Sequence, residues 1–178
     1  MTMAQRYKAG SFSKGVAWWS VLLILLAVAG GVALFYFNRD GNAVAVWYCC
    51  VVVSLLLLAL ITLPSGAVVS ELGVEIRCVL RSVYIPPEDV CSVRTMEWSS
   101  LGRVVPMGGV FGFLGYYGTF YSTSSRQRIT MFARSRNSLV ELRTKEHCYI
   151  LSLAEAEEFI AAVDSLRSEA KHFENQTK

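Results

Sequence analysis

The stretch that decides the fold of this chain is Val16–Phe37, which reads VAWWSVLLILLAVAGGVALFYF and contains no charged residue. As an α-helix it spans about 33 Å, close to the roughly 30 Å hydrocarbon core of a bilayer. A second uncharged stretch, Ala43–Leu63, follows the short polar segment Asn38–Asn42. The two stretches therefore predict a transmembrane helical hairpin over residues 16–63. The alternatives are the buried core of a soluble protein and a signal sequence cleaved near Ala45.

Residues that flank the two spans indicate their orientation. Trp18 and Trp19 open the first span, as aromatic side chains do at the headgroup level. Three basic residues precede this span: Arg6, Lys8 and Lys14. The connecting segment offers only Arg39, so the excess of positive charge places the N-terminus in the cytoplasm. Two crossings return residues 64–178 to the same side, and we expect a multi-pass protein of the inner (cell) membrane.

The composition offers little chemistry. Apolar residues make up 53% of the chain and charged residues 17%, against about 25% in ordinary soluble domains. The five cysteines include no C-x-x-C pair, which suits reduced thiols. No Cys or carboxylate spacing joins His147 and His172 into a metal site. The neighbouring His147 and Cys148 favour a strand-edge residue beside a buried thiol over a Cys–His nucleophile. We therefore expect no catalytic, cofactor or metal site, and a chain that is not an enzyme.

Short strands are predicted from residue 66 to about residue 151. Val74, Ile76 and Cys78 alternate with polar residues, the period of a half-buried strand. Further strands are expected over 82–85, 90–96, 128–132, 138–143 and 148–151. Short turns near 135–137 and 145–146 predict that the last three strands form a meander.

The C-terminal part changes to the helical period. Ser152 and Glu155 have the spacing of a capping box. One apolar helical face follows, made of Phe159, Ile160, Val163 and Leu166. The chain thus divides into an N-terminal segment 1–15, the hairpin 16–63, a domain 64–171 and a polar tail 172–178.

Three motifs in this domain resemble the bacterial pleckstrin-homology-like (PH-like) domains that are often attached to membrane spans. The motifs are 85–93 (IPPEDVCSV), 108–118 with Phe120, and 139–142 with 149–152 and 157–160. The resemblance covers about residues 66–168. It implies an α+β, mainly β fold, a PH-like antiparallel sandwich or barrel capped by a C-terminal amphipathic helix.

The second of these motifs, GGVFGFLGYYG over 108–118, lacks the G-x-G-x-x-G and P-loop patterns of phosphate-binding loops, and no helix pattern follows it. Two interpretations stay open. The glycines can build an irregular loop or bulged strand. Alternatively, aromatic residues present a surface to the bilayer or to a partner, namely Phe111, Phe113, Tyr116 and Tyr117, with Leu114 among them.

Basic residues gather in the same region. Between Arg94 and Arg136 there are six arginines, which include Arg126 and Arg128, and a single acid, Glu97. Such a region can lie against an anionic leaflet, or it can be a solvated face. The resemblance places the basic residues of inositol-lipid-binding relatives in the first hairpin turn, which here is Glu71–Gly73 without a basic residue. No specific phosphoinositide site is therefore expected.

These observations favour a membrane-anchored binding or scaffolding protein. Its PH-like domain would serve self-association or the docking of another membrane protein at the cytoplasmic face. The alternative is an accessory subunit of a transport or envelope-maintenance complex. The expected partners are the lipid bilayer and proteins, and no nucleic acid.

Overall fold

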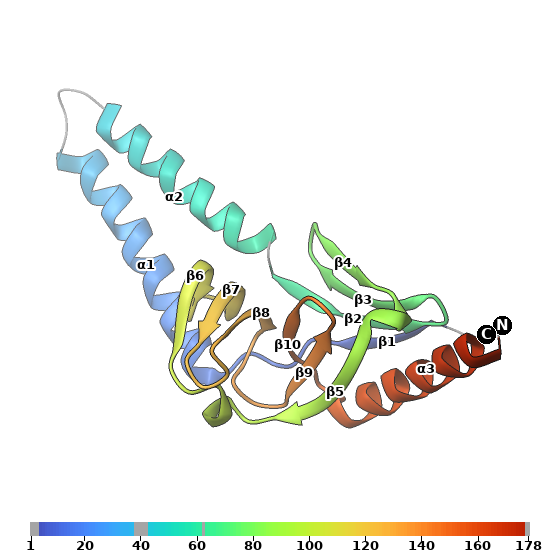
Figure 1. Ribbon diagram of the computed structural model, residues 1–178. Coiled ribbons are helices and arrows are strands. Elements are labelled where there is room, and N and C mark those ends of the chain that lie inside the picture. Colours follow the sequence, from blue (N-terminus) through green and yellow to red (C-terminus); the bar gives the residue numbers. More distant parts are fainter. Residues whose placement is uncertain (1–3, 38–42, 62, 177–178) are drawn as a thin grey trace.

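The computed structural model describes residues 4–37, 43–61 and 63–176, with side chains as far as residue 170. Two long helices extend from a domain of two sheets (Figure 1). They are α1, Lys14–Phe37, and α2, Ala43–Ile61. α1 begins slightly before the predicted Val16, and α2 ends slightly before the predicted Leu63. The predicted polar turn Asn38–Asn42 lies outside the described residues.

Both helices are long and apolar enough to cross a membrane. Their side chains point outward on all sides: Leu25 is 60% exposed and Leu55 is 64% exposed. One polar contact joins the pair, in which the Tyr48 hydroxyl donates to the Ala27 carbonyl oxygen at 3.1 Å. A Cβ atom at Gly30 would lie 2.8 Å from that hydroxyl. The glycine in α1 therefore makes room for the tyrosine of α2.

The first sheet has the order β1-β2-β3-β4 and is entirely antiparallel. Its strands are β1, Gln5–Lys8; β2, Pro64–Ser70; β3, Gly73–Cys78; and β4, Ser82–Ile85. Tyr7 lies opposite Ala67, so the segments on either side of the hairpin pair with each other. The N-terminal segment is therefore not separate from the domain, because Gln5–Lys8 forms an edge strand of its first sheet.

The second sheet has the order β5-β9-β10-β8-β7-β6. Its strands are β5, Val90–Met96; β6, Val104–Phe111; β7, Tyr116–Ser122; β8, Gln127–Ala133; β9, Leu139–Thr144; and β10, Cys148–Ser152. Two 3-10 turns flank β5, η1 (Pro87–Asp89) and η2 (Trp98–Leu101). β10 runs parallel to β8, and β9 lies between β5 and β10. The predicted meander of the last three strands is wrong, because β8 and β9 follow each other in sequence without pairing.

The C-terminal helix α3, Ala156–Gln176, covers the sandwich. Phe159, Val163 and Leu166 are buried in the core between the sheets, as their spacing predicts. The predicted capping box is wrong, because Ser152 ends β10 and its hydroxyl accepts from the Arg134 N–H at 2.9 Å. α3 also runs through the predicted tail to Gln176. The two sheets stay open rather than closing into a barrel: β1 and β4 are the edges of the first sheet, and β5 and β6 are the edges of the second.

A second core lies on the other face of the second sheet and ties the hairpin to the domain. Val16, from the first turn of α1, is buried there with Leu101, Tyr116 and Phe120. The first turn of α1 therefore belongs to the packed domain, and the exposed apolar part of the helix begins after it.

Candidate membrane-contact site

The β6–β7 turn takes its shape from glycines. The Gly112 N–H donates to the Gly115 carbonyl oxygen at 2.8 Å and closes the turn. Gly112 and Gly115 have φ angles of 86° and 129°, and Leu114 between them has a φ of 53°. Left-handed backbone angles of this kind cost glycine little and other residues more. The turn therefore holds Phe113 and Leu114 in a conformation that its two glycines make accessible.

The glycines within β6 and β7 have a different role: they allow the backbones of the two strands to approach each other closely. Gly109 lies opposite Gly118 across β6 and β7, and the register shifts between Pro106 and Gly108. A Cβ atom at Gly118 would lie 2.3 Å from the Gly108 carbonyl oxygen. This is the bulged strand of the first interpretation, and these strand glycines allow the two backbones to approach each other.

The β6–β7 turn contacts the helical hairpin directly. The Leu114 N–H donates to the Ser20 hydroxyl oxygen at 2.9 Å, and that hydroxyl donates to the Val16 carbonyl oxygen at 2.7 Å. Ser20 lies about 9 Å along the helix axis from Lys14, at 1.5 Å per residue. The tip of the turn therefore reaches the same level on α1 as the exposed ring of Trp19.

The four aromatic residues predicted to form a contact surface differ in exposure. Phe111 is exposed, with its ring against Tyr116, and Phe113 is half-buried at the turn. Tyr116 and Tyr117 are both buried. Burial raises the pKa of the Tyr117 hydroxyl, which therefore stays protonated. The structure thus brings Phe111 and Phe113 to the surface and turns the two tyrosines inward.

Two arginines stack on aromatic rings beside α1. The Arg136 guanidinium lies 4.7 Å from the centre of the Trp98 ring, and its Nε donates to the Tyr116 hydroxyl at 2.8 Å. The Arg134 guanidinium lies 5.0 Å from the centre of the Phe12 ring, and its Nε donates to the Pro64 carbonyl oxygen at 3.0 Å. The sequence shows both arginines in a basic region, whereas these cation–π contacts depend on long-range packing.

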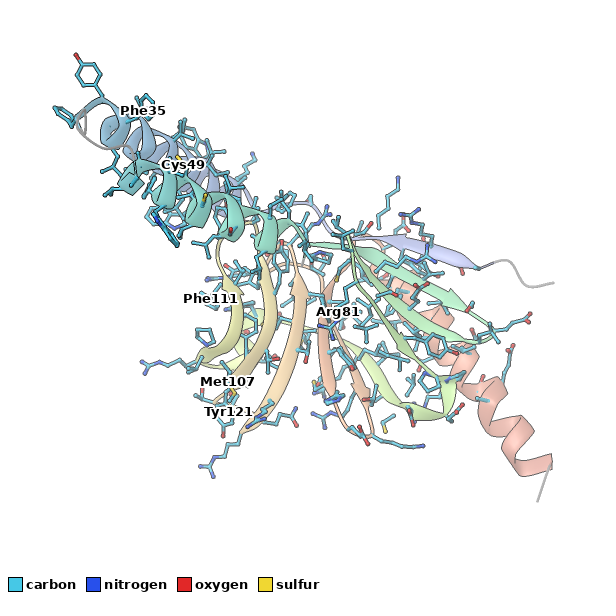
Figure 2. The ribbon with its side chains drawn as sticks, turned by 90° about the horizontal axis from the view of Figure 1, so that it is seen from above. Phe35, Cys49, Arg81, Met107, Phe111 and Tyr121 are labelled. Atoms are coloured by element: carbon cyan, nitrogen blue, oxygen red, sulfur yellow. The ribbon has the colours of Figure 1, made fainter. Side chains whose placement is uncertain are left out.

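Arg126 and Arg128 lie at the opposite end of the same strands. Arg128 pairs in register with Tyr121, whereas the end of β7 beside α1 is Tyr116. Five strand residues separate the two ends by about 17 Å. Figure 2 shows Tyr121 and Met107 farther from the helix pair than Phe111. The predicted aromatic and basic residues therefore form two surfaces rather than one.

The β3–β4 loop also lies beside the hairpin, and the sequence patterns did not predict this contact. The Val79 N–H donates to the Leu63 carbonyl oxygen at 3.0 Å, which fixes the β3–β4 loop beside the end of α2. Val79 is 55% exposed and Leu80 is 74% exposed. Two adjacent exposed apolar residues in a turn are the signal that could have identified this loop. The Glu71–Gly73 turn lies at the other end of β3, away from the helices (Figure 1).

Among the described residues, the most buried charged side chain lies on the same face of the second sheet as the second core. The Glu141 carboxylate pairs with Arg94 at 2.5 Å and with Arg143 at 3.1 Å. The Cys148 thiol donates to the same carboxylate at 3.4 Å. Burial opposes ionisation of Glu141, but these partners outweigh it and lower the pKa of the carboxyl group. Burial, with the negative charge beside it, raises the pKa of Cys148 to about 12. This arrangement supports the sheet and leaves the thiol unreactive.

The family described as Bacterial PH domain matches residues 66–167, more than half of the chain, and the chain belongs to that family. Comparisons with curated proteins and with solved structures returned no match. PH-like domains are generally non-catalytic binding modules. Among the described residues no three His, Cys, Asp or Glu side chains are placed to hold a metal ion. A bacterial PH domain that carries two helices able to cross a membrane fits membrane-associated docking.

Proposed function

We propose that the chain is a membrane-anchored docking protein whose hairpin crosses the inner membrane and whose domain lies in the cytoplasm. The observation that supports this most is the apolar surface of α1 and α2, which is exposed on all sides and carries no charge after Lys14. In water such a surface would be strongly unfavourable, whereas lipid chains solvate it. The exposed side chains of Arg6, Lys8 and Lys14 favour the cytoplasmic side for the domain.

A reporter fused after Lys178 tests this orientation. An enzyme that is active only in the cytoplasm should be active in the fusion, and one that is active only in the periplasm should be inactive. Because the hairpin brings both of its ends to one side, a reporter fused before Met1 should give the same pattern. The reverse pattern for either fusion would overturn the proposed topology.

We also propose that the β6–β7 turn touches the bilayer interface through Phe113 and Leu114. The hydrogen bond to Ser20 supports this depth, and the neighbouring Trp19 is a residue type typical of the headgroup region. Replacing Phe113 with photoreactive p-benzoylphenylalanine should give crosslinks to phospholipid in native membranes. The same replacement at the exposed Tyr121 is the matched control and should not. Equal lipid crosslinking from both positions would contradict the proposed contact.

The surface at the far end of the strands is proposed to dock a protein. Val105, Met107 and Tyr121 are exposed there, with the cationic Arg126 and Arg128 beside them. Exposed apolar side chains flanked by arginine are typical of protein interfaces. The mass of the purified protein in mild detergent should exceed that of one chain, through a second copy or another protein. Changing Met107 and Tyr121 to serine together should return it to one chain, and an unchanged mass would refute this surface.

The second candidate, an accessory subunit of a transport or envelope-maintenance complex, is favoured by one feature of the hairpin. An apolar groove of 530 Å³ runs between α1 and α2 and is lined by the small residues Ala27 and Gly31. Small residues at such positions let a further transmembrane helix approach closely. A partner that co-purifies through this groove should be lost when Gly31 is changed to leucine.

A further inference from the structure

A groove of 410 Å³ separates the β3–β4 hairpin from the face of β7, β8 and β10. It exists because the two sheets do not close into a barrel at this corner. Val83, Phe132 and Tyr149 supply apolar walls, and the hydroxyl-bearing side chains of Thr119 and Thr130 line its middle. The groove therefore has a mixed lining that suits an amphiphilic molecule.

The mouth of the groove lies at the end of the membrane hairpin. Ile61, the last residue of α2, is part of the lining. The hydrogen bond between the Val79 N–H and the Leu63 carbonyl oxygen holds the β3–β4 loop beside that mouth. The exposed Val79 and Leu80 continue the apolar surface of α2 onto the domain. A lipid molecule alongside α2 would thus have its polar end at the entrance to the groove.

The lining of the groove carries a positive charge and no negative charge. Arg81 lines it, and Figure 2 shows this residue between the two sheets. The Arg81 side chain makes no ion pair with any described residue, and none of the lining residues is a carboxylate. Tyr117 also lines the groove, and its buried hydroxyl has no hydrogen-bond partner among the described residues. Arginine binds phosphate oxygens well, and an unpaired buried donor is costly without an acceptor.

We propose that this groove binds the headgroup of an anionic phospholipid while the acyl chains stay in the bilayer beside α2. Arg81 contacts the phosphate at the mouth, and the rest of the headgroup extends along Thr119 and Thr130. The inference rests on the proposed membrane anchoring. It assigns a site distinct from the Glu71–Gly73 turn, which lies at the far end of the first sheet and carries no basic residue.

Native mass spectrometry of the purified full chain in detergent tests the proposal. With phosphatidylglycerol and phosphatidylcholine at equal concentration, the chain should retain the anionic lipid preferentially. Arg81→Gln should lower that preference about fivefold, which corresponds to about 1 kcal/mol for one basic residue near anionic lipid. Arg103→Gln is the matched control, because Arg103 is exposed beside Thr123 at the opposite end of the strands. It should leave the preference unchanged.

A second pair of variants tests whether the lipid preference depends on the space inside the groove or only on its positive charge. Thr130→Phe fills the groove without changing charge and should also abolish the preference. Thr130→Val keeps the size of the side chain and removes one hydroxyl, so it should weaken the preference for the anionic lipid. This variant provides the test if Thr130→Phe does not fold. Equal losses from Arg103→Gln and Arg81→Gln, or full preference in a folded Thr130→Phe variant, would overturn the proposal.

Glycerol phosphate in millimolar excess distinguishes a lipid from a soluble phosphate. It should leave the bound phosphatidylglycerol in place, because the acyl chains also hold the lipid against α2. Complete displacement would overturn a lipid site in favour of a soluble ligand. The proposed anchoring is tested separately by whether the chain sediments with membranes. A chain that sediments normally but lacks lipid preference refutes the groove alone.

Discussion

Changing Ser20 to alanine should release the β6–β7 turn from the hairpin. Ser20 is buried, and its hydroxyl oxygen is the acceptor for the Leu114 N–H at 2.9 Å. An unsatisfied buried N–H costs about 1–3 kcal/mol. The higher helix propensity of alanine offsets roughly 0.5 kcal/mol of this cost. The net loss of about 0.5–2.5 kcal/mol corresponds to a roughly 2- to 70-fold change in a local equilibrium.

Hydrogen exchange of the full chain in detergent measures this change directly. The Leu114 amide should exchange about 2- to 70-fold faster in the Ser20→Ala variant, whereas amides of α3 should be unaffected. Ser54→Ala makes the same chemical change at an exposed position of α2 and should leave exchange at Leu114 unaltered. Unchanged protection of Leu114 in the Ser20→Ala variant would refute the direct link between turn and hairpin.

Three further outcomes follow from the packing of the domain. Gly118→Ala should destabilise the chain by about 3 kcal/mol in thermal or denaturant unfolding, because its φ of 112° and the nearby backbone exclude a Cβ atom. Gly108→Ala, with nothing within 4 Å, should cost under about 0.5 kcal/mol, and similar losses for both would contradict the bulge. The lowered pKa of Glu141 means that its stabilisation is present above the ordinary carboxyl pKa and lost as the pH falls. Glu141→Gln should therefore flatten the acid limb of a plot of stability against pH. Iodoacetamide at mildly alkaline pH should label the exposed Cys91 and spare Cys148, whose pKa of about 12 keeps it protonated; rapid labelling of both would argue against burial.

Local sequence patterns predicted much of the fold. The uncharged runs identify α1 and α2 because bilayer thickness sets their length, and strict alternation identifies β3. β1 was missed because only Tyr7 among its residues is buried and its partner lies beyond the hairpin. The parallel pairing of β8 with β10 was missed because β9 separates these two strands in the sequence. Short turns suggest neighbours in sequence, whereas strand order depends on contacts between distant segments.

The candidate site was predictable only in part. Glycine-rich sequence indicated an unusual backbone, and the positive φ angles at Gly112 and Gly115 agree with that reading. The pattern could not tell which aromatic rings face outward, and Tyr116 and Tyr117 point into the domain. The depth of the turn depends on its contact with Ser20, which lies 94 residues before Leu114 in the sequence. Such long-range contacts leave no local periodicity.

The central claim is that lipid, rather than water or protein, surrounds α1 and α2. Sedimentation of membranes washed with alkaline carbonate tests it most directly, because this wash removes peripheral proteins and leaves spanning helices in place. The full chain should remain in the pellet and move to the supernatant only with detergent. Recovery of the chain in the carbonate supernatant would contradict the claim.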